Sequence, residues 1–114
     1  MKRKVLVVDE KKIHRVVFRV ILANYGYRVF EAEGFNSALE TFDREKPIAL
    51  ITDYNLKDSA GNGLDLIRTL RERKVQIPMV VMSRDPRVEE QITGLSAIFW
   101  NKAREPATIM SFLP

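Results

Sequence analysis

The stretch that decides the fold is Lys4-Val5-Leu6-Val7-Val8-Asp9-Glu10, an apolar run that ends in two carboxylates. A continuous apolar run of this length is typical of a strand that is buried on both faces of a sheet. Three later runs are each followed by one polar or charged residue: Asp53 follows Ile48-Ala49-Leu50-Ile51-Thr52, Ser83 follows Met79-Val80-Val81-Met82, and Lys102 follows Ile98-Phe99-Trp100-Asn101. If these runs are parallel strands of one sheet, their polar end residues gather at a single edge.

Amphipathic segments separate the apolar runs. Between Lys12 and Asn24 apolar residues recur at helical spacing, and Gly26 stands where a C-terminal cap belongs. Alternating strands and helices predict an α/β fold with a doubly wound parallel sheet and right-handed crossovers. The remaining expected elements are a strand over 27–32, a helix that Asn36 caps and Pro47 ends, a helix through Leu64, Ile67 and Leu70, at most a short helix over 88–95, and a final helix opened by Pro106.

The bulk properties predict one soluble domain over residues 1–114. The chain has 114 residues and no cysteine, which excludes disulfides and thiolate metal sites and fits an intracellular location. After the basic N-terminal segment Met1 to Lys4, only four apolar residues precede Asp9, which is too few for a signal peptide. No apolar run approaches membrane-spanning length, so we expect a cytoplasmic protein that does not enter a membrane.

The net charge of +4 raises the question of nucleic-acid binding. The basic residues are spread along the chain, with one cluster at Lys11, Lys12, Arg15 and Arg19 and no interleaved aromatic residues. This pattern favours a solvated helix face over direct nucleic-acid binding. His14 is the only histidine, and with no second histidine to join it we expect no metal or catalytic role for it.

The polar residues that end the apolar runs suit a cation and a phosphoryl group. Mg²⁺ prefers oxygen ligands and takes only a few carboxylates, and Asp9, Glu10 and Asp53 would repel one another strongly without a cation. Phosphoryl transfer depends mainly on positioning and on neutralising charge on the transferred oxygens. The hydroxyl of Ser83 and the ammonium of Lys102 are groups that can contact those oxygens.

The chain resembles the receiver domains of two-component response regulators over nearly its whole length. The motifs that carry the resemblance are Val7-Val8-Asp9-Glu10, Leu50-Ile51-Thr52-Asp53-Tyr54-Asn55-Leu56, Gly63-Leu64-Asp65-Leu66-Ile67, Val80-Val81-Met82-Ser83 and Phe99-Trp100-Asn101-Lys102. The resemblance implies a flavodoxin-like fold with five parallel strands in the order 2-1-3-4-5. It also implies a signalling switch rather than a metabolic enzyme, one that catalyses only its own phosphorylation and dephosphorylation.

The resemblance assigns four residues to the phosphoacceptor and metal site. Asp53 would take the phosphoryl group from a phosphohistidine of a histidine kinase or a phosphotransfer protein. Glu10 would coordinate Mg²⁺, Asp9 would ligate it directly or hold a metal-bound water, and Asn55 would offer its backbone carbonyl.

Three further residues are implied to carry the conformational switch. Lys102 would pair with Asp53 and later with a phosphoryl oxygen, and Ser83 would donate its hydroxyl to another phosphoryl oxygen. Phe99 stands at the position of the family's switch aromatic. The downstream protein or output domain that reads the switch is not implied by any residue.

Several positions depart from the family pattern. Ala103 stands where a proline joined by a cis bond is usual, so the Lys102–Ala103 bond is open between cis and trans. Lys57 replaces another usual proline, and the loop over 57–62 is about two residues longer than is common. We also expect a short helix four and a truncated helix five.

Two alternatives to the phosphorylated switch remain. The departures are compatible with a receiver-like interaction module that acts without phosphorylation. A Mg²⁺-dependent phosphatase on a related fold would need a second aspartate two residues after Asp53 as a general acid, and Asn55 stands there.

Overall fold

The computed structural model describes residues 3–114 and contains one parallel sheet with helices on both faces. The strands are β1 (Arg3–Val8), β2 (Tyr27–Ala32), β3 (Ala49–Asp53), β4 (Met79–Ser83) and β5 (Ile98–Asn101). Their order across the sheet is β2-β1-β3-β4-β5, and every pairing is parallel. The predicted fold class and strand order are therefore confirmed.

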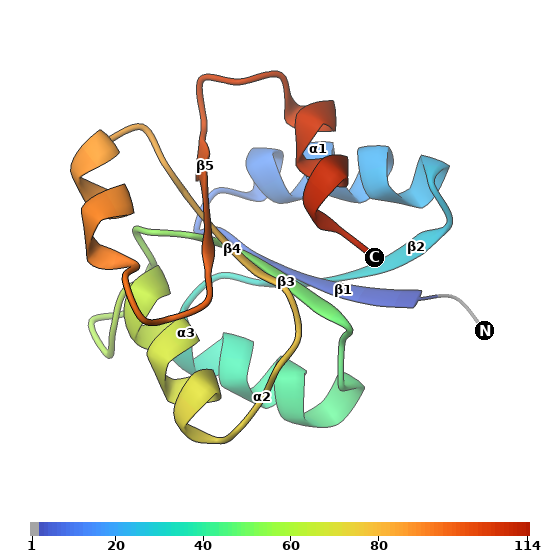
Figure 1. Ribbon diagram of the computed structural model, residues 1–114. Coiled ribbons are helices and arrows are strands. Elements are labelled where there is room, and N and C mark those ends of the chain that lie inside the picture. Colours follow the sequence, from blue (N-terminus) through green and yellow to red (C-terminus); the bar gives the residue numbers. More distant parts are fainter. Residues whose placement is uncertain (1–2) are drawn as a thin grey trace.

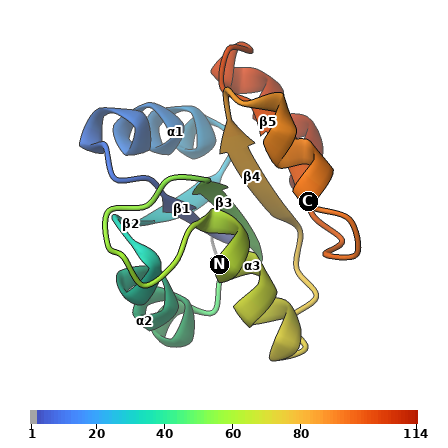
Figure 2. The same cartoon turned by 90° about the vertical axis from the view of Figure 1, so that its left-hand side faces the viewer.

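The helices form two layers around the sheet (Figures 1 and 2). They are α1 (Lys12–Asn24), α2 (Phe35–Glu45) and α3 (Gly63–Glu72), followed by the 3-10 segments η1 (Pro86–Gln91) and η2 (Pro106–Phe112). In Figure 1, α1 and η2 lie above the sheet, and α2 and α3 lie below it. The fourth and fifth helices are thus reduced to short 3-10 segments, as expected.

The central strands are buried on both faces, which explains their continuous apolar runs. Successive residues of a strand point to opposite faces, so Val5 and Val7 join the apolar cluster under α1 and η2. Leu6 and Val8 join the other cluster, which α2 and α3 cover and which reaches Val88 of η1. All five residues of β3 and of β4 are buried, so the residues at the ends of these strands have firmly fixed positions.

The start of α2 differs from the prediction. Asn36 does not cap this helix; the helix begins at Phe35, and Gly34 holds the N-cap position. The carboxylate of Asp58, delivered by the loop after β3, accepts hydrogen bonds from the backbone N–H groups of Phe35 and Asn36, each at 3.1 Å. The carboxylate of Asp58 thus accepts the free backbone N–H groups at the start of α2, which a side chain at the N-cap position usually does.

The junction between β3 and α3 is unusually close. Asn62 caps α3 by accepting the backbone N–H of Asp65 at 2.9 Å, and the N–H of Gly63 donates to the carbonyl of Tyr54 at 2.8 Å. A Cβ atom added to Gly63 would lie 2.2 Å from the carbonyl oxygen of Asp53. Glycine at position 63 therefore allows the helix to begin directly against the end of β3.

The loop after β5 contains no cis peptide bond. All peptide bonds across the described residues 3–114 are trans, so Lys102 and Ala103 are joined by a trans bond. The N–H of Lys102 donates to the carbonyl of Ser83 at 3.1 Å, and the N–H of Ala103 donates to the side-chain oxygen of Asn101 at 2.9 Å. The first bond extends the pairing of β4 and β5 up to the lysine, and the second is local to the loop.

Candidate functional site

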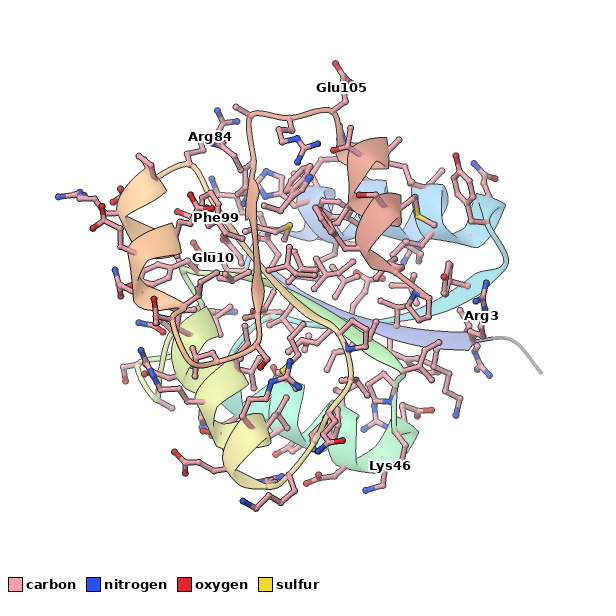
Figure 3. The ribbon with its side chains drawn as sticks, viewed as in Figure 1. Arg3, Glu10, Lys46, Arg84, Phe99 and Glu105 are labelled. Atoms are coloured by element: carbon pink, nitrogen blue, oxygen red, sulfur yellow. The ribbon has the colours of Figure 1, made fainter. Side chains whose placement is uncertain are left out.

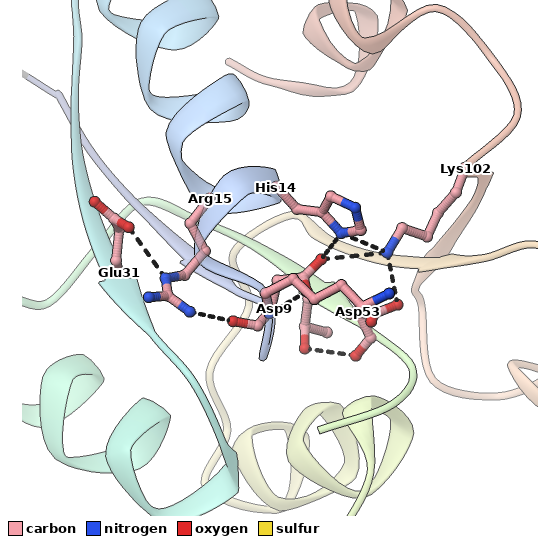
Figure 4. A network of polar contacts seen from close by, with 8 residues as sticks. Asp9, His14, Arg15, Glu31, Asp53 and Lys102 are labelled. Carbon is pink, nitrogen blue, oxygen red and sulfur yellow. Dashed lines mark hydrogen bonds and ion pairs between the residues drawn. The ribbon is translucent and has the colours of Figure 1, made fainter. Parts of the chain in front are cut away.

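The carboxyl ends of four strands position the predicted site residues, and Figure 4 shows three of them, Asp9, Asp53 and Lys102, close together. Asp9 directly follows β1, and its N–H donates to the carbonyl of Ala32 at 3.1 Å, which continues the pairing with β2. Asp53 and Ser83 are the last residues of β3 and β4. Lys102 follows β5, so its side chain reaches the same edge of the sheet.

The ammonium of Lys102 joins the two aspartates. Its Nζ lies 3.2 Å from Oδ2 of Asp9 and 3.4 Å from Oδ1 of Asp53. The side chain of Asp9 is completely buried, and that of Asp53 is only 9% exposed. Two buried carboxylates therefore share one ammonium, so these three groups together carry a net negative charge.

Burial sets the proton affinity of Asp53. Desolvation raises the pKa of this carboxyl above its ordinary value; Lys102 lowers it and the neighbouring Asp9 raises it further. The lysine does not fully offset the other two effects. A second cation beside Asp53 would favour its ionised form, since an opposite charge within a few ångström stabilises a carboxylate.

A cavity of about 360 Å³ opens above Asp53. Its lining includes three of the predicted site residues besides Asp53 and Lys102, namely Glu10, Asn55 and Ser83. Glu10 and Asn55 are exposed at this opening. Asp9 lies beneath the cavity and does not line it, because both its oxygens face protein donors: Oδ1 accepts the N–H of Lys11 at 2.9 Å, and Oδ2 faces Lys102.

The oxygen donors around this cavity fit a hydrated divalent cation. Among residues 3–114 no three acidic or imidazole side chains already converge as a metal cage. Mg²⁺ does not need such a cage, because it keeps several waters and is usually held by one or two carboxylates. Asp53, Glu10 and Asn55 line one cavity and carry oxygen donors, so the chemistry of this lining suits Mg²⁺.

Ser83 and Phe99, the two predicted switch residues, lie on the neighbouring strands β4 and β5. The Oγ of Ser83 accepts the N–H of Asp85 at 3.0 Å, which still allows its hydroxyl proton to be donated into the cavity. Phe99, labelled in Figure 3, is partly buried and packs against the cluster that contains Val88. Their movement on phosphorylation stays a prediction.

Two residues of α1 belong to the site although the sequence pointed to a solvated face. Arg15 is only 9% exposed; its guanidinium donates to the carbonyl of Asp9 at 2.7 Å and to Glu31 at 3.1 Å. His14 contacts the carboxylate of Asp9 through Nδ1 at 3.1 Å. The assignment of Arg15 to a solvated face was wrong, because its partner Glu31 lies on a neighbouring strand and cannot be inferred from helical spacing.

The chain matches the family model "Response regulator receiver domain" over residues 5–100. It is 35% identical over 109 residues to the chemotaxis protein CheY1 of Helicobacter pylori, covering 92% of this chain and 86% of that protein. It is 34% identical over 93 residues to the KDP operon transcriptional regulatory protein KdpE of Escherichia coli. That match covers 82% of this chain and only 40% of the relative's length.

Solved structures share the fold. The chemotaxis protein CheY4 of Vibrio cholerae superposes with a TM-score of 0.84 at 21% identity, over 97% of this chain and 95% of that one. NtrX of Brucella abortus reaches the same TM-score at 24% identity, with 26% of its chain covered. Within residues 3–114 no helix is long and apolar enough to cross a bilayer. With the family model spanning residues 5–100, this chain belongs to the response regulator receiver domain family.

Proposed function

We propose that Asp53 is the phosphoacceptor of a Mg²⁺-dependent two-component switch. The observation that carries the proposal is the placement of a buried aspartate beneath an open cavity, 3.4 Å from the ammonium of Lys102. A phosphoryl group on Asp53 would find the Lys102 cation and the Ser83 hydroxyl within the same enclosure. Both groups neutralise or bind phosphoryl oxygens, which is the main requirement of phosphoryl transfer.

In this proposal Glu10, Asp53 and the backbone carbonyl of Asn55 hold Mg²⁺, while Asp9 acts from beneath the site. The metal supplies charge neutralisation for the transferred phosphoryl group when it is bound. Lys102 favours the ionised form of Asp53, since its charge is the largest of the effects that lower the pKa of this carboxyl. Autophosphorylation and slow dephosphorylation would be the only reactions.

The phosphoryl donor we propose is a histidine kinase or a phosphotransfer protein, in agreement with the partners of receiver domains in general. Residues 1–114 would act as one receiver domain in the cytoplasm. The movement of Ser83 and Phe99 would carry the signal, because an acyl phosphate adds roughly one further negative charge beside them.

The test uses Trp100 as a reporter. This residue is 2% exposed, lies two positions before Lys102, and donates its indole N–H to Thr108 at 3.0 Å. Mg²⁺ followed by beryllofluoride, a phosphoryl mimic, should change the fluorescence of Trp100, and Asp53→Asn should abolish the response. Asp43→Asn is the matched control and should respond normally, because Asp43 is an exposed carboxylate on α2 that pairs with Arg73 at the end of α3.

The alternatives give different results in the same assay. No fluorescence response and no mass increase with acetyl phosphate would indicate an interaction module that acts without phosphorylation. Turnover of a phosphate ester would indicate a phosphatase.

A further inference from the structure

His14, which α1 places over the site, forms a triangle of polar contacts with the two charged groups beside Asp53 (Figure 4). Its Nδ1 lies 3.1 Å from Oδ2 of Asp9 and 3.2 Å from Nζ of Lys102. The third side of the triangle is the contact of 3.2 Å between Lys102 and Asp9. A single ring nitrogen cannot donate to the carboxylate and accept from the ammonium at once, so one of these contacts must be the hydrogen bond.

The burial of the two partners decides between the contacts. The carboxylate of Asp9 is completely buried and can accept hydrogen bonds only from protein groups. The side chain of Lys102 is 16% exposed and borders the open cavity, so its remaining protons can reach water. If Nδ1 carried no proton, its lone pair would face the buried carboxylate of Asp9. That arrangement costs more free energy than a protonated Nδ1 beside the partly hydrated ammonium of Lys102. Nδ1 therefore carries the proton and donates it to Asp9.

We propose that His14 is a positioning residue that holds Asp9 so that Lys102 is free to serve Asp53. This inference rests on the proposed phosphoacceptor function. Without the histidine, Oδ2 of Asp9 would depend on Lys102 alone for a side-chain donor, and the lysine would be held on Asp9. With the histidine in place, Asp9 keeps a donor when Lys102 turns towards a phosphoryl oxygen on Asp53.

The tautomer of His14 can be read without metal or phosphoryl mimic. The ring nitrogen shifts of the ¹⁵N-labelled protein, recorded at mildly alkaline pH where free imidazole is neutral, report which nitrogen carries the proton. His14 is the only histidine, so the signals need no assignment by mutation. We expect a protonated Nδ1. An Nδ1 that carries no proton would overturn the inference.

Three substitutions separate positioning from packing. His14→Asn places its amide nitrogen near the position of Nδ1, His14→Gln places it near that of Nε2, and His14→Leu removes the donor. The side chain is 36% exposed in the first turn of α1, so all three variants should fold, and thermal unfolding checks this.

The readout is the beryllofluoride concentration at half of the Trp100 response, with Mg²⁺ saturating. We expect His14→Leu and His14→Gln to bind the mimic about tenfold more weakly, the loss of one hydrogen bond to a charged group, and His14→Asn to stay within about threefold of wild type. Wild-type binding by His14→Leu, or equal rescue by glutamine and asparagine, would refute the positioning role. If wild type itself gives no response, the phosphoacceptor proposal fails, and the nitrogen shifts still decide whether His14 holds Asp9.

Discussion

Replacing Lys102 by methionine tests whether one ammonium holds two buried carboxylates together. The variant keeps the length of the side chain and removes the charge that lies 3.2 Å from Asp9 and 3.4 Å from Asp53. At an effective dielectric constant of about 20, each attraction is about 5 kcal/mol before the cost of desolvating the ammonium is subtracted. Removing one partner of a buried pair typically costs about 3–5 kcal/mol. Because the side chain of Lys102 is 16% exposed, we expect the lower value, about 3 kcal/mol.

The loss should depend on pH in a defined direction. Lys102 lowers the pKa of Asp53, which burial and Asp9 raise, so the variant should have an even higher pKa at this carboxyl. A folded-state pKa above the unfolded value penalises the fold wherever the carboxyl must ionise. The penalty therefore grows as the pH rises above the unfolded carboxyl pKa of about 4, and it disappears below that pH.

Urea unfolding of both proteins, followed by Trp100 fluorescence without metal, measures this difference. Lys57→Met is the control, because the ion pair of Lys57 with Glu33 is shorter, at 2.8 Å, but its side chains are 67% and 48% exposed. This control should match wild type within error, since exposed pairs contribute little. Added Mg²⁺ should stabilise Lys102→Met more than wild type. An unchanged midpoint at neutral pH, or a deficit that grows on acidification, would refute the reasoning.

Three further substitutions probe the scaffold of the site. Asp53→Asn should raise the free energy of unfolding at neutral pH, because burial raises the pKa of this carboxyl, and the gain should fade below about pH 4. Equal urea midpoints for the variant and the wild type at neutral pH would contradict this. Gly63→Ala should lower stability by about 1–3 kcal/mol and weaken beryllofluoride binding, because its Cβ would press on the carbonyl of Asp53. The control is Gly26→Ala, at a positive φ in open space, which should lower stability by about 1–2 kcal/mol and leave binding intact. Asp58→Ala should lower stability by about 1 kcal/mol in thermal unfolding by removing the cap of α2, and an unchanged melting temperature would show that the cap contributes nothing.

The sheet and the edge where the site lies could be predicted from the sequence, because a strand buried on both faces is a continuous apolar run. A strand such as β3, with all five residues buried, must be apolar until it ends, and the first polar side chain then marks the edge. Asp53 was found in this way. The strand order itself came from the resemblance to receiver domains, since apolar runs alone do not say which strands are neighbours.

The contacts that the sequence did not predict join segments far apart in the chain. Asp58 caps a helix 22 residues earlier, and Arg15 pairs with Glu31 on β2. His14 reaches Lys102 across 88 positions. Helical spacing correctly placed His14 and Arg15 on the polar face of α1. A polar helix face can, however, pack over a buried carboxylate such as Asp9 instead of facing water. Only the strand order shows that this face lies over the site.

The two acids that follow β1, Asp9 and Glu10, lie in different surroundings, as neighbouring residues of a strand do. Asp9 is completely buried and pairs with Lys102, whereas the next residue, Glu10, is exposed and lines the cavity. A buried carboxylate paired with an ammonium stabilises the position of that ammonium but is poorly available to a hydrated cation. An exposed carboxylate beside Asp53 can attract such a cation without desolvating it fully, which is the mode of binding that Mg²⁺ prefers. We therefore expect Glu10→Gln to weaken Mg²⁺ binding without loss of stability, and Asp9→Asn to lower stability and the affinity for beryllofluoride together.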